Sequence, residues 1–437
     1  AWLRSLAVLA CLTAEHLLAE INNYMIDLLV LPLLLEATWM IICPSSDGKT
    51  VGLKEVVRFF LLMGMSVGLK LTNLTFAGPL CLLFAYSWIS TEPASPRPPI
   101  SKSLVAATAA FAAPIIPWTF YLWYRTGSPI FPLYNEIFRS PHWQLVNFFD
   151  GRWGPKGVIE TLLWPLAVVF TPERLSELNF YSGRMLLGWV VALSSLVFVR
   201  KDPALKAMCG LTLGCGFLWS VSTGYIRYGL YLELLAGILT VACLAILIKS
   251  TDVRWQQSVR YAVAGVVLIA LVTQCYFAAA WSFDHEWGGR PNCIRQRGCK
   301  NEFVQFFSDR TISQYETDEE YQLFANIDVW VETAPKTSAM MVMLRSDIPG
   351  LTYFPAFYEA PASRSSVAAS LERLRGKRFF SLVVDDESGK SDSAKTLKML
   401  GFTVKKVTSV KIPYFSRENT IPMLLIELQP PPNNELP

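Results

Sequence analysis

The stretch YAVAGVVLIALVTQCYFAAAW, residues 261–281, contains no charged side chain. A helix of this length can cross the ~30 Å hydrocarbon core of a membrane. Comparable apolar runs cover residues 28–43, 104–124 and 231–248, the last interrupted only by Glu233. Most of these runs lack the polar face that a helix on a soluble core requires. The sequence therefore predicts a polytopic α-helical membrane protein.

The composition agrees with this fold class. The chain has 437 residues, of which 52% are hydrophobic and 17% charged, and that charged fraction is low for a soluble protein. The net charge of +4 is mild, and the cations lie mostly in short loops, where they act as orientation signals. Because no nucleic-acid-binding motif is visible, we expect no nucleic acid partner. The chain begins at Ala1 inside an apolar segment, so we expect an N-terminally truncated fragment of a longer protein.

The basic loops predict the topology. Placing residues 49–58, 97–102, 200–206 and 249–260 in the cytoplasm satisfies the positive-inside rule at every turn. About nine spans then follow, several of them shorter than the usual ~20 residues. The predicted spans are residues 2–19, 24–43, 56–69, 74–89, 104–124, 183–199, 207–222, 229–248 and 261–281.

A further apolar segment, residues 158–170, is too short for a span and is interrupted by Pro165. If it crossed the membrane, every downstream basic loop would change sides. We therefore expect it to be re-entrant or to lie on the outer surface.

From Phe283 the composition becomes that of a soluble domain. Two segments with helical periodicity end just before Gly376 and Gly401, as helices often do, and they alternate with strand-like stretches. This predicts a small extracytoplasmic α/β domain with a partly parallel sheet, residues 301–429, after a multi-spanning module, 1–281, and a linker, 282–300. A proline-rich tail, 430–437, is predicted to be disordered. The expected strands are 339–344, 351–354, 379–384, 402–410 and 422–428, and the expected helices are 366–375 and 393–400.

Seven of the nine cysteines lie in or beside apolar runs and are expected to act as small hydrophobic residues. Cys293 and Cys299 stand apart in the linker, where an extracytoplasmic location favours a disulfide; the alternative is two free thiols. A metal site there would need two more ligands, and none is close in sequence.

Polar side chains inside the multi-spanning module gather at the helix ends opposite the basic loops. Ionisable groups beside lipid are costly, so such a one-sided collection indicates a site. The collection comprises Glu15, His16, Asn22, Asn23, Tyr24, Asp27, Lys70, Arg125, Asn135, Arg139, His142, Arg152, Arg227 and Tyr228.

Several of these residues have a simple alternative explanation. Asp27 is expected about one turn into its helix, where a carboxylate needs a cation, a hydroxyl-rich ligand or a proton as its partner. The alternative is that Asp27 lies at the level of the lipid headgroups and has no specific role. Lys70 follows a glycine-rich stretch and could hold an anionic headgroup as a point charge, or it could merely snorkel to the surface. Arg227 suits a phosphate because its planar fork matches two oxygens, or it could pair with Glu233.

The longest loop, residues 117–143, reads PWTFYLWYRTGSPIFPLYNEIFRSPHW. Its aromatic rings fit the headgroup level of a membrane, and cations such as Arg125 and Arg139 could face anionic lipid. An ordinary loop at the membrane interface would explain the aromatic residues by themselves. It explains less well why these residues occur together with Arg125, Asn135, Arg139 and Arg152.

The order of four segments resembles the multi-spanning GT-C glycosyltransferases, which include protein O-mannosyltransferases, aminoarabinose transferases and the bacterial glycosyltransferase family 39 or RgtA/B/C/D-like proteins. The segments are NNYMIDLLVLPLLLEA (22–37), GMSVGLKLTNLTFAGP (64–79), PWTFYLWYRTGSPIFPLYNEIF (117–138) and GYIRYGLYLELLAGIL (224–239). They are similar to the family's Tyr-x-x-Asp helix start, its Gly-x-x-x-Gly-x-Lys segment, its Arg-Thr-Gly loop and its Arg-Tyr span start.

The resemblance implies an integral membrane glycosyltransferase that moves a sugar from a polyprenyl-phosphate donor to a glycan, lipid or protein acceptor. The reaction would take place at the extracytoplasmic face, with the C-terminal domain in the periplasm of a bacterial inner-membrane protein. The family's catalytic carboxylate lies in the first outer loop, which we expect upstream of Ala1, so Asp27 would have a supporting role. A divalent metal is compatible with the resemblance, although no ligand set is indicated. The implied donor-phosphate ligands are Lys70, Arg125 and Arg227, and the substrate-site candidates are Glu15, His16, Tyr24, Asn135, Arg139 and Tyr228.

A second class of function is a non-catalytic polytopic protein: a transporter, a lipid-binding or scaffolding component, or an inactive relative of the transferases. Transporters place polar groups near the midplane, on broken helices in repeated halves. Here the polar groups lie at one rim and no repeat is visible, which favours the transferase.

Overall fold

The structure is a computed structural model in which two compact units can be described. One unit comprises residues 1–118 and 149–292, and the other comprises residues 119–148 and 293–437. The residues described are 2–20, 27–47, 52–90, 98–147, 151–175, 183–198, 202–249, 256–284, 323–333, 337, 341, 344, 347–352, 361–414 and 416–432.

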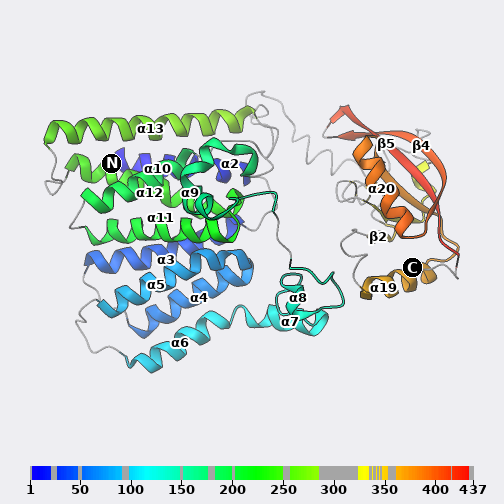
Figure 1. The fold of residues 1–437 in the computed structure, drawn as a ribbon, viewed down its shortest axis with the longest axis horizontal. Helices are drawn as coiled ribbons and strands as arrows, with labels where there is room; N and C mark the ends of the chain where they lie inside the picture. Colours follow the sequence, from blue (N-terminus) through cyan, green and yellow to red (C-terminus); the bar gives the residue numbers. More distant parts are fainter. Residues whose placement is uncertain are drawn as a thin grey trace. The chain divides into compact units, whose positions relative to one another are not determined.

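The first unit is a bundle of helices that run side by side (Figure 1). In chain order its elements are α1 (Trp2–Leu12), α2 (Glu15–Glu20), α3 (Asp27–Asp47), α4 (Leu53–Leu69), the 3₁₀ turn η1 (Leu71–Asn73), α5 (Leu74–Ser90), α6 (Ile100–Ala112), α9 (Val158–Ala167), η2 (Val168–Phe170), η3 (Pro172–Arg174), α10 (Gly183–Phe198), α11 (Pro203–Ser222), η4 (Ile226–Gly229), α12 (Leu230–Lys249) and α13 (Gln257–Asp284). Helix α7 (Ile116–Thr126) follows α6 and passes from the first unit into the second.

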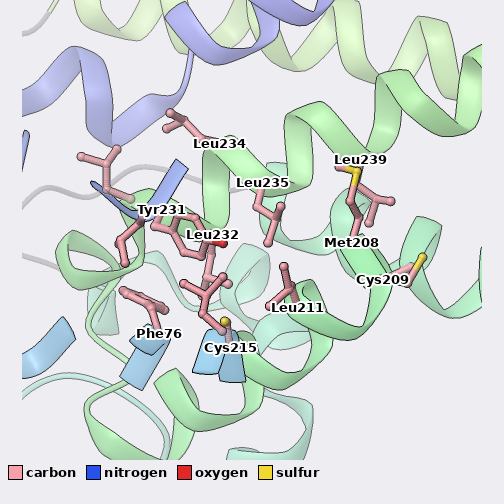
Figure 2. Packing of buried hydrophobic residues seen from close by; sticks show 14 of the residues in the cluster. Phe76, Met208, Cys209, Leu211, Cys215, Tyr231, Leu232, Leu234, Leu235 and Leu239 are labelled. Atoms are coloured by element: carbon pink, nitrogen blue, oxygen red, sulfur yellow. The ribbon is translucent and has the colours of Figure 1, made fainter. Parts of the chain in front are cut away.

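Helix α12 lies at the centre of the bundle, and apart from Glu233 its buried residues are almost all apolar, as expected for a buried helix. Figure 2 shows its residues Tyr231, Leu232, Leu235 and Leu239 among side chains from neighbouring helices. The Tyr231 ring lies 5.3 Å from the ring of Phe76 on α5. Its hydroxyl lies 2.7 Å from Thr38 Oγ1 on α3, so the one polar atom of this ring has a partner.

Within the described part of the chain, three helices are long and apolar enough to cross a membrane: Pro203–Ser222, Ile226–Lys249 and Gln257–Ala280. Helices α6 and α7 meet the same criteria as a pair, but they are bent by 53° relative to each other. The molecule thus has the apolar helices of a membrane protein, and the larger count of about nine spans remains a prediction.

The expected continuous helix over residues 104–124 is wrong. Helix α6 ends at Ala112 and α7 begins at Ile116. Pro114 cannot donate the backbone hydrogen bond that a continuous helix needs, and its ring crowds the preceding turn. The break packs closely against Gly68 of α4. A Cβ atom added to Gly68 would lie only 3.2 Å from the Pro114 carbonyl oxygen. Gly64, one turn earlier, packs directly on the backbone of Phe111, so the two glycines permit the close packing of α4 and α6.

Among the residues described in the second unit, five strands form a sheet with the order β2-β1-β3-β5-β4. Strand β1 (Val329–Glu332) pairs in parallel with β2 (Gly350–Thr352) and β3 (Phe379–Val384). Strand β5 (Ser416–Gln429) is antiparallel to both β3 and β4 (Thr403–Tyr414). The predicted partly parallel sheet is therefore confirmed.

Both faces of this sheet are covered. Val331, Phe379 and Ile426 pack in a cluster with residues of α19 (Pro361–Arg373) and α20 (Glu387–Met399), and Trp330 and Leu382 belong to a second cluster. The helices are followed by Gly376 and Gly401 with φ of 82° and 74°, as predicted.

Two strand predictions for this domain differ from the structure. The expected strand 339–344 is wrong, since Met341 and Leu344 are helical. Strand β1 was missed because its four residues include Glu332, which hides the apolar pattern. The linker cysteines Cys293 and Cys299 and the last five residues lie outside the described part of the chain.

Candidate functional site

Four residues from the predicted collection come together at one end of the helical unit. Asp27 is the first residue of α3, Lys70 follows α4, and Arg227 and Tyr228 lie in η4. Lys70 Nζ donates a hydrogen bond to Asp27 Oδ1, and Arg227 Nε lies 3.7 Å from Asp27 Oδ2. Lys70 Nζ also lies 4.1 Å from the centre of the Tyr228 ring, a cation–π distance. We call these four residues the Asp27 cluster.

The Asp27 cluster carries two cations and one carboxylate. The Asp27 side chain is 8% exposed, whereas those of Lys70 and Arg227 are 17% and 24% exposed. The carboxylate therefore lies beneath two cations that solvent can still reach. Such an arrangement keeps a positive charge at the surface, which favours an incoming anion.

Two of the simpler explanations given above are wrong. Lys70 is held by a carboxylate and an aromatic ring, so it does not merely snorkel. Glu233 pairs with His16, while Arg227 lies beside Asp27.

Local backbone geometry positions Lys70. The residue ends α4 in an extended conformation with φ −155°, and its amide donates to the Ser66 carbonyl. Asn73 is buried, and its Nδ2 donates to the same Ser66 oxygen at 2.9 Å, which fixes the turn into α5.

Three indole rings hold the turn that carries Arg227. Trp164 Nε1 donates to the Gly224 carbonyl at 2.9 Å, and Trp219 Nε1 donates to the Tyr225 carbonyl at 2.8 Å. The Trp153 ring stacks on Tyr225 with centroids 5.7 Å apart. Because buried indole N–H groups need acceptors, these contacts fix the carbonyl directions of the turn, and hence the backbone that presents Arg227.

The turn also requires glycine at its start. Gly224 has φ 57°, where other residues are strained. A Cβ at this position would lie 2.8 Å from both Gly154 Cα and Trp164 Nε1. The GYIRYG sequence therefore combines an unusual backbone with close packing.

A second polar group lies buried where α1, α2, α10, α12 and α13 meet. His16 Nδ1 is 3.0 Å from Glu233 Oε1, and the His16 amide donates to Glu233 Oε2 at 3.0 Å. Gln274 Nε2 donates to Glu15 Oε1 at 2.9 Å. Glu15 and His16 thus serve this internal network, which makes them supports of the bundle end.

The centre of this network is Arg184, which is fully buried. Its guanidinium donates to the carbonyl oxygen of Ala10, to that of Thr13 at 3.0 Å, and to Gln274 Oε1 at 3.2 Å. The amide of Ala14 bonds to the Cys11 carbonyl at 3.1 Å, so the Ala10 carbonyl has lost its usual helical donor. Arg184 therefore caps the carboxyl end of α1.

This capping explains why the prediction of one continuous helix over residues 2–19 is wrong. The chain breaks between Leu12 and Glu15, and Arg184 satisfies the carbonyl groups that the break exposes. Sequence reasoning missed Arg184 and Gln274. The available signal was a lone charge at the start of the apolar run 183–199.

Arg125, Asn135 and Arg139 belong to the other unit, which includes residues 119–148. Arg125 lies in the last turn of α7 and is exposed, and Arg139 is exposed with φ 52°. Asn135 begins α8 (Asn135–Phe138) and is fully buried. Its Nδ2 donates to the carbonyls of residues 140, 143 and 144 at 3.0 Å, and its Oδ1 accepts from the Ser140 amide at 2.7 Å. Asn135 is therefore a structural clamp of this loop, and its assignment as a substrate-site candidate remains a prediction.

The remaining predictions concern Tyr24 and a metal. Tyr24 lies outside the described residues. Among the residues that are described, no three His, Cys, Asp or Glu side chains gather in a group that could hold a metal ion.

The geometry of the Asp27 cluster fits recognition of a phosphate-like anion. Lysine supplies a point charge and arginine a planar set of donors. Comparison with protein families, curated proteins and solved structures finds no significant match to the chain.

Proposed function

We propose that the protein is an integral membrane glycosyltransferase that moves a sugar from a polyprenyl-phosphate donor to an acceptor at the face where the Asp27 cluster lies. The observation that carries this proposal is the contact of Lys70 and Arg227 with one buried carboxylate at the end of an apolar bundle. A lipid-linked phosphate would reach this position with its chain in the bilayer and its charge at the cluster. The acceptor is a glycan, a lipid or a protein.

In the proposed reaction an acceptor hydroxyl oxygen bonds to the anomeric carbon of the sugar. The bond between that carbon and the phosphate oxygen breaks, and its electron pair leaves on the polyprenyl phosphate. The acceptor proton passes to a carboxylate acting as general base. Lys70 and Arg227 would stabilise the negative charge that develops on the leaving phosphate.

Asp27 has the supporting role in this proposal. With Lys70 on one oxygen and Arg227 near the other, it holds two like charges close together before the anion arrives. Preorganised charges of this kind stabilise a transition state without reorganising during the reaction. Asp27 is thus a positioning residue for the two cations.

Binding of a short-chain prenyl phosphate to the full-length protein in nanodiscs tests the site. We expect Lys70→Ala and Arg227→Ala to weaken binding about tenfold or more, since each removes a charge-assisted contact worth about 1.5–3 kcal/mol. Lys54→Ala is the matched control, because Lys54 lies exposed at the opposite end of α4. Equal affinity in all three variants would remove the phosphate role from the cluster. Phosphate binding without any sugar transfer would favour the alternative of a non-catalytic lipid-binding protein.

A further inference from the structure

Helix α9 and the turn η2 present an apolar face that the bundle leaves uncovered. Trp164 and Val168 point into the bundle and are fully buried. In contrast, five apolar side chains of the same segment are between 50% and 78% exposed. These are Val158, Ile159, Leu162, Leu163 and Phe170. Such a contiguous apolar surface is unusual next to water and marks an interaction site.

The segment is firmly attached beside the Asp27 cluster. Trp164 donates to the Gly224 carbonyl, and the Ile226 amide donates to the Leu175 carbonyl at 3.1 Å, directly after η3. The exposed face of α9 is therefore held at a fixed place relative to the turn that carries Arg227.

An internal ion pair adds to this rigidity. Arg174 makes two hydrogen bonds to Glu160, at 2.6 and 3.1 Å, and a third to the Gly154 carbonyl at 2.6 Å. The hydrogen-bonded Arg174 guanidinium holds the pKa of the Glu160 carboxyl below its usual value, so the pair stays ionised at neutral pH. Residues 154–174 thus form one braced unit.

The length of the segment excludes a full crossing of the membrane. Ten residues of α-helix cover about 15 Å, half of the hydrocarbon thickness. Helix α9 packs on α11, a helix long and apolar enough to cross a membrane, whose residues Phe217 and Val221 are also exposed. Lys156, just before α9, is exposed and positively charged, which suits an anionic headgroup.

We propose that α9 is an interfacial helix seated in a phospholipid leaflet, with its exposed apolar face among the upper acyl chains and Lys156 at an anionic headgroup. Amphipathic helices with this combination of an apolar face and flanking cations lie in the interface plane. Because α9 is fixed to the Gly224–Arg227 turn, its depth sets the depth of the Asp27 cluster at the membrane surface. This inference does not depend on the transferase proposal.

Photo-crosslinking of the full-length protein tests the occupant directly. Benzoylphenylalanine replaces Ile159 or Leu163 in protein held in nanodiscs of phosphatidylcholine and phosphatidylglycerol. Ile269 on α13, which is 68% exposed on a candidate span, is the positive control, and Val404 on β4, which is 54% exposed in the sheet domain, is the negative control. Unchanged elution in size-exclusion chromatography identifies folded variants.

We expect lipid adducts by mass spectrometry at Ile159 and Leu163, with yields comparable to Ile269, and a loss of adducts at Val404. The Lys156→Glu variant should lower the share of phosphatidylglycerol among the adducts, whereas Glu173→Gln, an exposed control on η3, should leave it unchanged. Adducts to a second copy of the chain, or no adducts at either α9 position, would overturn the proposal. An unchanged phosphatidylglycerol share in Lys156→Glu would overturn the anionic headgroup contact.

Discussion

Arg184 offers the most severe test of how the helical unit is held together. Its guanidinium is fully buried and donates to the Ala10 and Thr13 carbonyls and to Gln274. Replacing it with alanine would leave the two carbonyls without donors in an apolar interior. Removing one partner from a buried charged network costs about 3–5 kcal/mol, because the groups left behind lose their compensation.

This cost converts into a measurable shift. One kcal/mol corresponds to about 2–4 °C in the unfolding midpoint of a unit of about 250 residues. Arg184→Ala should therefore lower the midpoint by about 6–20 °C. Arg184→Lys should lower it less, since a lysine keeps the charge but loses the fork that reaches three acceptors.

Thermal unfolding of the detergent-solubilised protein, followed by size-exclusion chromatography, measures these shifts. Arg4→Ala is the matched control: Arg4 is an exposed arginine on α1, and its loss should change the midpoint by about 2 °C or less. If Arg184→Ala does not accumulate, Arg184→Lys supplies the comparison. A midpoint for Arg184→Ala equal to that of Arg4→Ala would refute the capping of α1 by this guanidinium.

Three further predictions concern other contacts. Gly64→Ala forces a methyl group onto the α6 backbone and should destabilise the bundle by about 1–3 kcal/mol, whereas Gly210→Ala, which meets open space, should not lower the thermal midpoint. Asn135→Ala removes the donor to three loop carbonyls, so limited proteolysis should cut residues 139–147 faster than in the wild type. Hydrogen bonds from Arg378 hold the pKa of Asp328 below its usual value. The ionised carboxylate therefore stabilises the fold fully at pH values above its unfolded-state pKa of about 3.9. Because the pair is partly exposed, this contribution is about 1 kcal/mol or less. The difference in stability between wild type and Asp328→Asn should therefore disappear as the pH falls through the folded-state pKa, and a constant difference would contradict it.

The polar exceptions in an apolar sequence carried most of the predictive information about the site. Asp27, Lys70 and Arg227 were predicted to share one end of the bundle, and the structure places them within one ion-pair cluster. Helix directions alone produce this result, because antiparallel helices return to the same side at alternate ends. The apolar runs likewise predicted the helical unit, and Gly376 and Gly401 marked the helix ends of the second unit.

Other features depend on contacts between distant residues and could not be read from local patterns. The break after α1 is stabilised by Arg184, which is 171 residues away from Thr13. Asn135 is a substrate-site candidate by the family resemblance, and its sequence context did not reveal that its hydrogen bonds close its own loop. Strand β1 includes a charged residue that a buried parallel strand would not be expected to contain.

The most direct test of the central claim is sugar transfer from a radiolabelled polyprenyl-phosphate donor by the full-length protein in membranes. We expect turnover in the wild type and in Lys54→Ala, and loss of turnover in an Arg227→Ala variant that remains folded and membrane-inserted. Full activity in Arg227→Ala, or no turnover with any common donor by a folded wild-type protein, would contradict this claim.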